Sequence, residues 1–340
     1  MMRILLLADT HLGFDYAFRP RIVRRRRGPD FFHNFSKALE PALRKEVDIV
    51  VHGGDILYRS RVPARLVDMA FEPLRAVADG GVPVYIVPGN HERSGIPFRI
   101  LAAHPNIHVF DEPKTYWLER NFRLALVGFP FIRHGIRKKF RQVMNSTGYA
   151  TVQAAGYVLC MHQSVDGCIM GPRDFMMRGG DDVVNIHEIP PSFCCVLTGH
   201  MHRSQVLQKD PAGNAVQVPI LYPGSIERTS FAEMDERKGY IIVQIHKGVS
   251  EKAELGRWIF HELPTRPMIR LEYHYNGQDS FTPWLLHRLG RLPKDSIVKI
   301  RVHGSVDRKL QKKITAASLR SLAPDTMNIQ IALDLHRRNS

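Results

Sequence analysis

The sequence predicts an α/β protein with a second, smaller α+β domain, and three observations support this fold class. Across roughly the first 245 residues, short β-rich apolar runs alternate with segments of helical periodicity. A change of composition at residues 263–267 separates this region from a shorter and more basic one. The length of 340 residues suits about two domains and is ample for a buried core. We therefore expect domains over residues 1–262 and 263–340.

In the first domain, the spacing of apolar residues predicts each element in turn. Gly80 and Gly81 are expected to end the second helix, and Pro73 to kink it. The expected helices cover residues 31–43 and 64–79, and the expected strands cover residues 4–8, 48–52, 82–87, 124–128, 157–161, 193–198 and 239–245.

The second domain is predicted to alternate strand and helix, as an α+β unit does. The expected order is strand 269–273, helix 283–289, strand 297–302, helix 307–322 and strand 328–333. Residues 263–340 hold 14 Lys and Arg against 6 Asp and Glu, so this domain carries much of the positive charge.

Composition excludes several classes of protein. A chain that is 44% hydrophobic and 24% charged is neither disordered, collagen-like nor a coiled coil as a whole. No apolar run approaches the ~18 residues of a membrane span, so no membrane association is expected. The apolar N-terminus runs into Asp9 without a cleavage site, which favours a strand over a signal peptide. Four cysteines without disulfide or metal spacing predict a reduced, cytoplasmic protein, with Cys194 and Cys195 as packing residues.

The net charge points to a polyanionic partner. Lys and Arg number 48 against 33 Asp and Glu, which gives a formal net charge of +15 and a pI near 9.9. Such a balance favours nucleic acid as a partner, although many basic proteins bind none.

Five short segments concentrate side chains that bind metals, and each follows a predicted strand. In open α/β sheets the strand ends converge on one edge, so side chains distant in sequence can meet there. Glycines beside three of the segments suit sharp turns that aim the next side chain into a site. The segments are Asp9-Thr10-His11, Gly54-Asp55, Gly89-Asn90-His91-Glu92, Met161-His162 and Gly199-His200-Met201-His202.

Together the segments predict a site for two divalent ions. Oxygen and imidazole donors without thiolate suit Mn²⁺, Fe²⁺ or Zn²⁺ better than Ca²⁺. A carboxylate can bridge two ions, and Asp55 is the expected bridge. Such a pair lowers the pKa of a shared water and clamps a phosphoryl group. The seven candidate ligands are Asp9, His11, Asp55, Asn90, His162, His200 and His202.

These segments resemble the metallophosphoesterase (calcineurin-like) superfamily, and more narrowly the SbcD-type DNA double-strand-break repair nucleases. The narrower resemblance depends on residues 9–13, 30–32, 222–228 and 264–267, and it covers essentially the whole chain. It implies a four-layer αββα sandwich followed by a small α+β capping domain that guides DNA. It also implies a homodimer and an SbcC-like ABC-type ATPase partner, although no further helical segment of the kind that binds such an ATPase is visible.

The resemblance assigns a role to each candidate residue. Asp9, His11, Asp55 and His202 would hold one ion, and Asp55, Asn90, His162 and His200 would hold the other. His91 would be a catalytic histidine that is not a ligand and that stabilises the transition state or protonates the leaving oxygen. Three residues after Asp55, where archaeal and eukaryotic relatives usually have histidine, this chain has Tyr58.

Several arginines near the motifs are candidates for phosphate contacts. For the run Arg24, Arg25, Arg26 and Arg27, a solvated charged loop is an equally good explanation. The other candidates are Arg59, Arg61, Arg93 and Arg133.

We therefore expect a Mn²⁺-dependent DNA exonuclease and endonuclease that hydrolyses phosphodiester bonds at double-strand ends and in single strands. Its expected location is cytoplasmic and nucleoid-associated. One alternative keeps the site and changes the substrate, giving a phosphodiesterase or phosphatase for nucleotides or phosphoproteins. Another is a structural DNA-end-binding subunit with an idle site.

Overall fold

The computed structural model describes residues 1–20, 24–92, 103–151, 153–277, 280–304 and 306–334, and it divides the chain into two compact units. Unit 1 comprises residues 1–14 and 28–264, and unit 2 comprises residues 15–27 and 265–340. This division differs from the expected domains, because residues 15–27 fall in unit 2 and not in the first domain. They belong with unit 2 through contacts such as the hydrogen bond from Asn328 Nδ2 to the Arg25 carbonyl oxygen (2.9 Å). A contact between residues so far apart leaves no local pattern in the sequence.

Unit 1 contains two six-stranded mixed sheets. In the first, with the order β16-β15-β1-β2-β3-β4, strands β1 to β4 run parallel and β15 and β16 add antiparallel neighbours. Its strands are β1 (Met2–Leu7), β2 (Ile49–His52), β3 (Val84–Ile86), β4 (Ile107–Val109), β15 (Gly239–Lys247) and β16 (Ala253–Glu262).

The second sheet has the order β13-β14-β12-β7-β6-β5. Its four central strands are parallel, and an antiparallel strand closes each edge. Its strands are β5 (Lys114–Glu119), β6 (Arg123–Gly128), β7 (Gly156–Met161), β12 (Phe193–Thr198), β13 (Gln205–Lys209) and β14 (Ala215–Tyr222).

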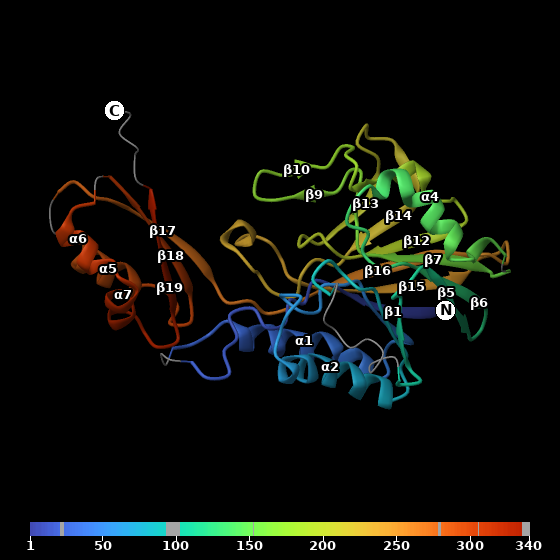
Figure 1. Cartoon of the computed structure of the whole chain (residues 1–340), viewed down its shortest axis with the longest axis horizontal. Coiled ribbons are helices and arrows are strands. Elements are labelled where there is room, and N and C mark those ends of the chain that lie inside the picture. Colours follow the sequence, from blue (N-terminus) through green and yellow to red (C-terminus); the bar gives the residue numbers. More distant parts are fainter. Residues whose placement is uncertain (21–23, 93–102, 152, 278–279, 305, 335–340) are drawn as a thin grey trace. The chain divides into compact units, whose positions relative to one another are not determined.

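Helices cover the outer faces of both sheets, which confirms the four-layer αββα sandwich (Figure 1). Helices α1 (Gly28–Leu43) and α2 (Ala64–Asp79) cover the first sheet, and α4 (Ile136–Ser146) covers the second. Between the sheets lies a core of fully buried side chains, each worth about 1.5–3 kcal/mol relative to exposure. It includes Ile4, Val51, Leu126, Val158 and Leu197.

The sequence predicted helix α2 with its observed bounds but did not predict α4. Only Ile136, Phe140 and Met144 of α4 are buried, and basic residues between them obscure the apolar stripe. Strands β4, β5, β13, β14 and β16 were also not predicted, because each of them is either very short or only partly buried. The described part of the chain contains no helix long and apolar enough to cross a membrane.

Short strands and single turns lie in the connections before and after the strands of the second sheet. Two small two-stranded pairings are formed by β8 with β11 and by β9 with β10. These are β8 (Ser164–Val165), β9 (Ile169–Met170), β10 (Phe175–Met176) and β11 (Val183–Val184). Single 3₁₀ turns cover Tyr149–Thr151, Ile186–Glu188 and Phe231–Glu233.

Unit 2 has a parallel three-stranded sheet in the order β17-β18-β19. Its strands are β17 (Met268–His274), β18 (Ile297–His303) and β19 (Asn328–Asp334), and its helices are α5 (Phe281–Leu289), α6 (Arg308–Lys313) and α7 (Ala316–Leu322). The prediction of one helix over residues 307–322 was wrong. The Thr315 side chain accepts a hydrogen bond from the Ser318 N–H and starts a new helix there.

Candidate metal centre

The five predicted segments all follow parallel strands, so their side chains come to one edge of each facing sheet. Asp9 lies just beyond β1, Asp55 beyond β2 and Asn90 beyond β3 in the first sheet. His162 directly follows β7, and His200 follows β12 in the second sheet. The αββα sandwich therefore brings together residues as distant in the chain as Asp9 and His200, which are 191 positions apart.

Four of the candidate ligands have backbone conformations that non-glycine residues rarely adopt. The φ angles are 51° at Asp9, 42° at His11, 54° at Asp55 and 80° at His200. Each such conformation costs of order 1–3 kcal/mol and persists only when its surroundings impose it. Strain of this kind clusters at functional sites, and here it turns each side chain off its strand toward the others.

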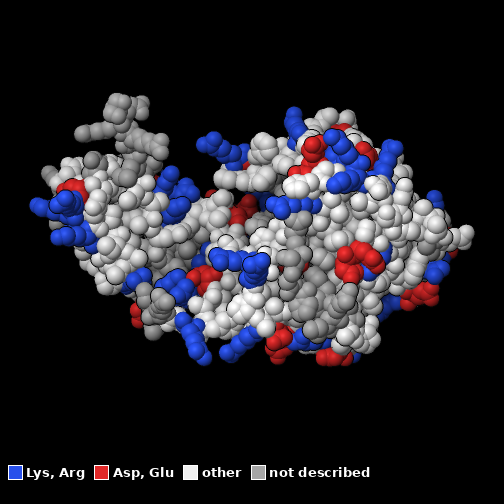
Figure 2. Space-filling model, viewed as in Figure 1, with Lys and Arg blue, Asp and Glu red and all other residues white. Residues whose placement is uncertain are grey.

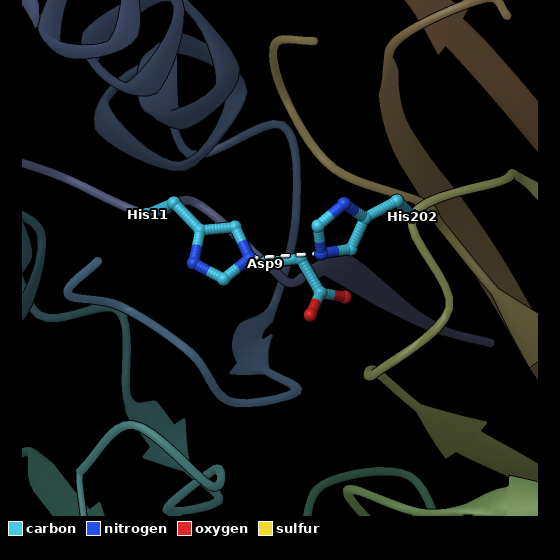
Figure 3. Close-up of side chains that lie close together, drawn as sticks. All are labelled: Asp9, His11 and His202. Carbon is cyan, nitrogen blue, oxygen red and sulfur yellow. Dashed lines mark hydrogen bonds between the residues drawn. The ribbon is translucent and has the colours of Figure 1, made fainter. Parts of the chain in front are cut away.

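Asp9, His11 and His202 form the first group of side chains (Figure 3). One ligand atom from each lies within 4.8 Å of the others, and the two histidine Nε2 atoms are 2.9 Å apart. Asp9 is fully buried, and its carboxylate accepts the backbone N–H of His200 at 3.0 Å. The two halves of the sandwich are thus joined at this point.

Asp55, Asn90, His162 and His200 form the second group. The Asn90 Oδ1 atom lies 3.1 Å from both His162 Nε2 and His200 Nδ1. Asp55 Oδ1 lies 3.6 Å from His162 Nε2. Asp55 also shares a cluster with Asp9 and His162 and another with His11 and His91. The structure therefore brings all seven predicted ligands together, with Asp55 between the two groups.

The orientation of the histidines fits a metal centre. His162 donates its Nδ1–H to the Gly53 carbonyl at 2.6 Å, and His202 donates its Nδ1–H to the Glu233 carboxylate at 3.1 Å. These oxygens can only accept, so in both rings Nε2 is the nitrogen that faces the site. Metal-binding histidines are usually held in this way. In addition, the buried His11 Nδ1 has no hydrogen-bond partner among the described residues.

The electrostatics of the cluster also fit bound cations. Burial lowers the pKa of His11 and of His200 to about 3, so both rings are neutral and keep lone pairs at pH 7. Burial opposes the charged form of His162 as well, but attraction to Asp55 and Asp9 exceeds this effect and raises its pKa to about 9. The site therefore stabilises positive charge where His162 meets Asp55. The donor set and this charge balance suit two divalent ions.

His91 lies beside Asp55 but points partly to solvent. Its backbone N–H donates to Asp55 Oδ1 (3.0 Å), and its Nε2 lies 3.8 Å from Asp55 Oδ2. Its Nδ1–H donates to the Tyr58 carbonyl at 2.6 Å. That contact uses the backbone of residue 58, so the unusual side chain at this position does not disturb it. His91 also forms a possible three-ligand group with His11 and Asp55.

Glu92 holds the loops together, a role that the sequence did not indicate. It is 3% exposed, and its carboxylate accepts N–H groups from Asp55 (2.8 Å), Leu57 (3.0 Å) and Gly89 (2.8 Å). Burial and the nearby Asp55 carboxylate raise the pKa of Glu92 to about 8, although the hydrogen bonds from Leu57 and Gly89 act in the opposite direction. The carboxyl group thereby ties the loop after β2 to the loop after β3.

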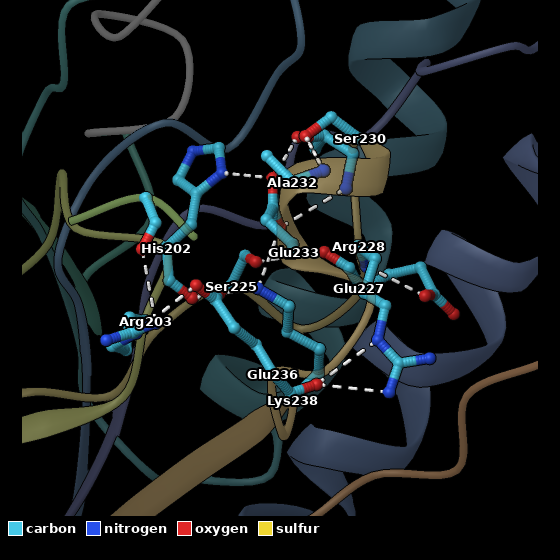
Figure 4. Close-up of polar contacts among 12 residues, drawn as sticks. His202, Arg203, Ser225, Glu227, Arg228, Ser230, Ala232, Glu233, Glu236 and Lys238 are labelled. Carbon is cyan, nitrogen blue, oxygen red and sulfur yellow. Dashed lines mark hydrogen bonds and ion pairs between the residues drawn. The ribbon is translucent and has the colours of Figure 1, made fainter. Parts of the chain in front are cut away.

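A buried ionic cluster behind His202 was also not predicted (Figure 4). The Lys238 side chain is fully buried, and its ammonium group donates to Glu233 (2.7 Å), to Glu236 (2.9 Å) and to the His202 carbonyl (2.9 Å). Despite burial, contacts with His202 and Lys238 hold the pKa of Glu233 well below its usual range. The ring of His202 is therefore oriented by a carboxylate that is itself held in place.

The predicted phosphate-contacting arginines occupy different environments. Arg24 and Arg26, in unit 2, pair with Asp15 at 3.1 and 3.0 Å, and Arg27 is buried. Arg25 lies in the same loop, and its carbonyl oxygen accepts the hydrogen bond from Asn328. In unit 1, Arg59 lies over the Tyr58 ring, Arg61 and Arg133 are exposed, and Arg93 lies outside the described residues.

Comparison with known proteins identifies the family of this chain. The family model named "Calcineurin-like phosphoesterase" matches residues 2–204. Three relatives named "DNA double-strand break repair protein Mre11" come from Archaeoglobus fulgidus, Methanococcus maripaludis and Haloferax volcanii. They are 23%, 23% and 38% identical over 94%, 70% and 82% of this chain. The chain spans 72%, 60% and 56% of their respective lengths. Because the family model matches more than half of the chain and its metal-binding segments converge as described, the protein belongs to the calcineurin-like phosphoesterase family.

Proposed function

We propose that this protein is a DNA nuclease that hydrolyses phosphodiester bonds at double-strand ends and in single strands, with two Mn²⁺ ions. The observation that carries the proposal is the convergence of seven ligand side chains on one edge of the sandwich. The net charge of +15 supports a polyanionic substrate. The printed names of the Mre11 relatives support DNA as that substrate.

The side chains present would hold the two ions in two overlapping sets. Asp9, His11, Asp55 and His202 make one set, and Asp55, Asn90, His162 and His200 make the other. When bound, such ions act as Lewis acids that lower the pKa of water and neutralise charge on a phosphoryl group. The chain itself supplies the orientation, because Glu233, the Gly53 carbonyl and Glu92 fix the ligand-bearing side chains and loops.

His91 is the group we propose for proton transfer. Its Nδ1–H is occupied by the Tyr58 carbonyl, so Nε2 is the atom that would give a proton to the leaving oxygen or stabilise its charge. Its side chain is 29% exposed, which gives that nitrogen access to a substrate from solvent.

The test is a substrate panel assayed with the purified full chain: duplex DNA ends, single-stranded DNA, a chromogenic phosphodiester and a cyclic nucleotide. We expect Mn²⁺ to support DNA degradation better than Mg²⁺, which suits imidazole-rich sites poorly, and excess EDTA to abolish it. Hydrolysis of the small substrates without DNA degradation would replace the nuclease by a small-molecule phosphodiesterase. Full activity after prolonged dialysis against EDTA would refute the two-metal centre.

The partners that we propose are DNA, a second copy of the chain and an SbcC-like ABC-type ATPase. They depend on the resemblance of residues 9–13, 30–32, 222–228 and 264–267 to SbcD-type nucleases. Light scattering on the purified chain tests the homodimer, which should have twice the 38.9 kDa chain mass. A monomer at micromolar concentration would refute it.

A further inference from the structure

The β9–β10 hairpin of unit 1 presents an exposed apolar pair. Met170 and Phe175 lie directly opposite one another in the antiparallel register, and they are 44% and 62% exposed. A large aromatic side chain left in water contributes little to the stability of a two-stranded ribbon. Single exposed apolar side chains need no explanation, but here two of them lie side by side on one short ribbon and together offer an apolar contact surface.

The hairpin is fastened to the loop that carries the metal ligands. Arg203, which follows His202, pairs through its guanidinium group with Asp174 and donates to the Gly171 carbonyl at 3.2 Å. Gln205 exchanges two hydrogen bonds with the backbone of Ile169, at 2.8 and 2.9 Å. The position of the hairpin is thus set by Arg203 and Gln205, which directly follow the candidate ligand His202 in the chain.

The charge around the apolar pair is positive. Arg173 in the turn and Arg178 after β10 are both exposed, and neither forms an ion pair with a residue that the structure describes. The acidic residue of the turn, Asp174, is neutralised by Arg203. Beyond the hairpin, Asp166 is held by Arg137 and by the Gly179 N–H. Figure 2 shows basic side chains at the free end of this hairpin.

We propose that the β9–β10 hairpin binds single-stranded nucleic acid: Phe175 stacks on an unpaired base, and Arg173 and Arg178 contact the flanking phosphates. Aromatic rings combined with basic groups are how proteins hold single strands without reading their sequence, because every base has a π face. A pair of apolar side chains is far smaller than the roughly 800 Å² per partner of a stable protein interface. The proposal deepens the nuclease function and rests on it for the phosphodiester strand that reaches the site.

Fluorescence anisotropy with a labelled oligo-dT strand tests the proposal, using the full chain in EDTA so that the strand is not cut. We expect Phe175→Ala to weaken binding about 10-fold, and Phe175→Tyr, which keeps the ring, to restore most of it. Val249→Ala removes part of a fully exposed apolar side chain elsewhere in unit 1 and should leave the affinity for the strand unchanged. Arg173→Gln and Arg178→Gln should each lower the log–log salt slope by about 0.7.

Binding by Phe175→Ala within twofold of the unaltered chain, with an unchanged thermal midpoint, would overturn the proposal. A change in oligomeric mass without a change in DNA affinity would instead make the hairpin a protein contact. Because the assay measures binding without cleavage, its result tests strand binding by the hairpin independently of the proposed nuclease function. Hairpin-dependent binding without nuclease activity overturns the nuclease alone, whereas cleavage with hairpin-independent binding overturns this proposal alone.

Discussion

Asp55 occupies the centre of the candidate site, between the two groups of ligands. If it bridges two ions, Asp55→Asn should impair both together, because the amide keeps one oxygen but loses the negative charge. We expect fewer than one ion per chain, against two in the unaltered protein, by elemental analysis of the Mn²⁺-loaded chain. The exposed Asp68 offers a matched control, and Asp68→Asn should retain both ions. Retention of two ions by Asp55→Asn would contradict the bridge.

A substitution at His91 tests whether catalysis can be lost while metal binding is kept. If it transfers a proton, His91→Gln should keep metal content and DNA affinity but lose about 10²-fold or more in rate. Single-turnover rates and metal content measured on the same preparation decide the question. Loss of one ion per chain would show that His91 is a ligand, an arrangement that its cluster with His11 and Asp55 would permit.

Glu233 orients His202 without belonging to the ligand set. Removing such a supporting partner typically costs 10–100-fold in metal affinity. Glu233→Gln should therefore weaken one of the two Mn²⁺ sites by about this factor in calorimetric titration. Glu236 touches the same lysine but not the histidine ring, so Glu236→Gln is the matched control and should keep both affinities. Equal losses in the two variants would indicate a general role of the ionic cluster in folding.

At the scale of elements, the strained backbone of the site lies in the loops that follow the strands. Gly54 has a φ of 102°, and a Cβ there would collide with the His162 ring. Gly81, after α2, has a φ of 87° but open space around the position of a Cβ. Each substitution by alanine should cost of order 1–3 kcal/mol from backbone strain.

Comparing Gly54→Ala with Gly81→Ala separates the effect of steric crowding at the metal centre from the effect of backbone strain alone. Gly54→Ala should lower the free energy of unfolding further than Gly81→Ala, and it alone should reduce metal content, because it displaces His162. Chemical denaturation and elemental analysis of both variants measure this. Equal metal content in the two variants would mean that the loop after β2 can shift without disturbing the ligands.

At the scale of the whole molecule, positive charge is denser in unit 2, and α6 carries the exposed Arg308, Lys309 and Lys312. Deleting unit 2 would be a poor test, since residues 15–27 of the N-terminal region belong to it. Replacing these three residues by glutamine should weaken duplex DNA binding and lower its salt slope by about 0.9 for each phosphate that the protein no longer binds. Lys37→Gln, on α1 of unit 1, should leave the slope unchanged. An unchanged slope in the triple variant would refute DNA guiding by α6.

Much of this protein was determined by its sequence alone. The parallel strands β1, β2, β3, β7 and β12 were predicted because fully buried strands are continuous apolar runs, a property of neighbouring residues. The candidate ligands were found because each follows such a run. The tertiary structure alone decided what supports them: Glu233 reaches His202, Glu92 joins two loops, the Tyr58 carbonyl holds His91, and residues 15–27 belong to unit 2. These contacts join residues far apart in the chain, and a polar partner at such a distance imposes no periodicity on the sequence around it. The positions of the candidate ligands in the sequence can therefore be predicted from local patterns, whereas the orientation of their side chains depends on the packing of the two sheets.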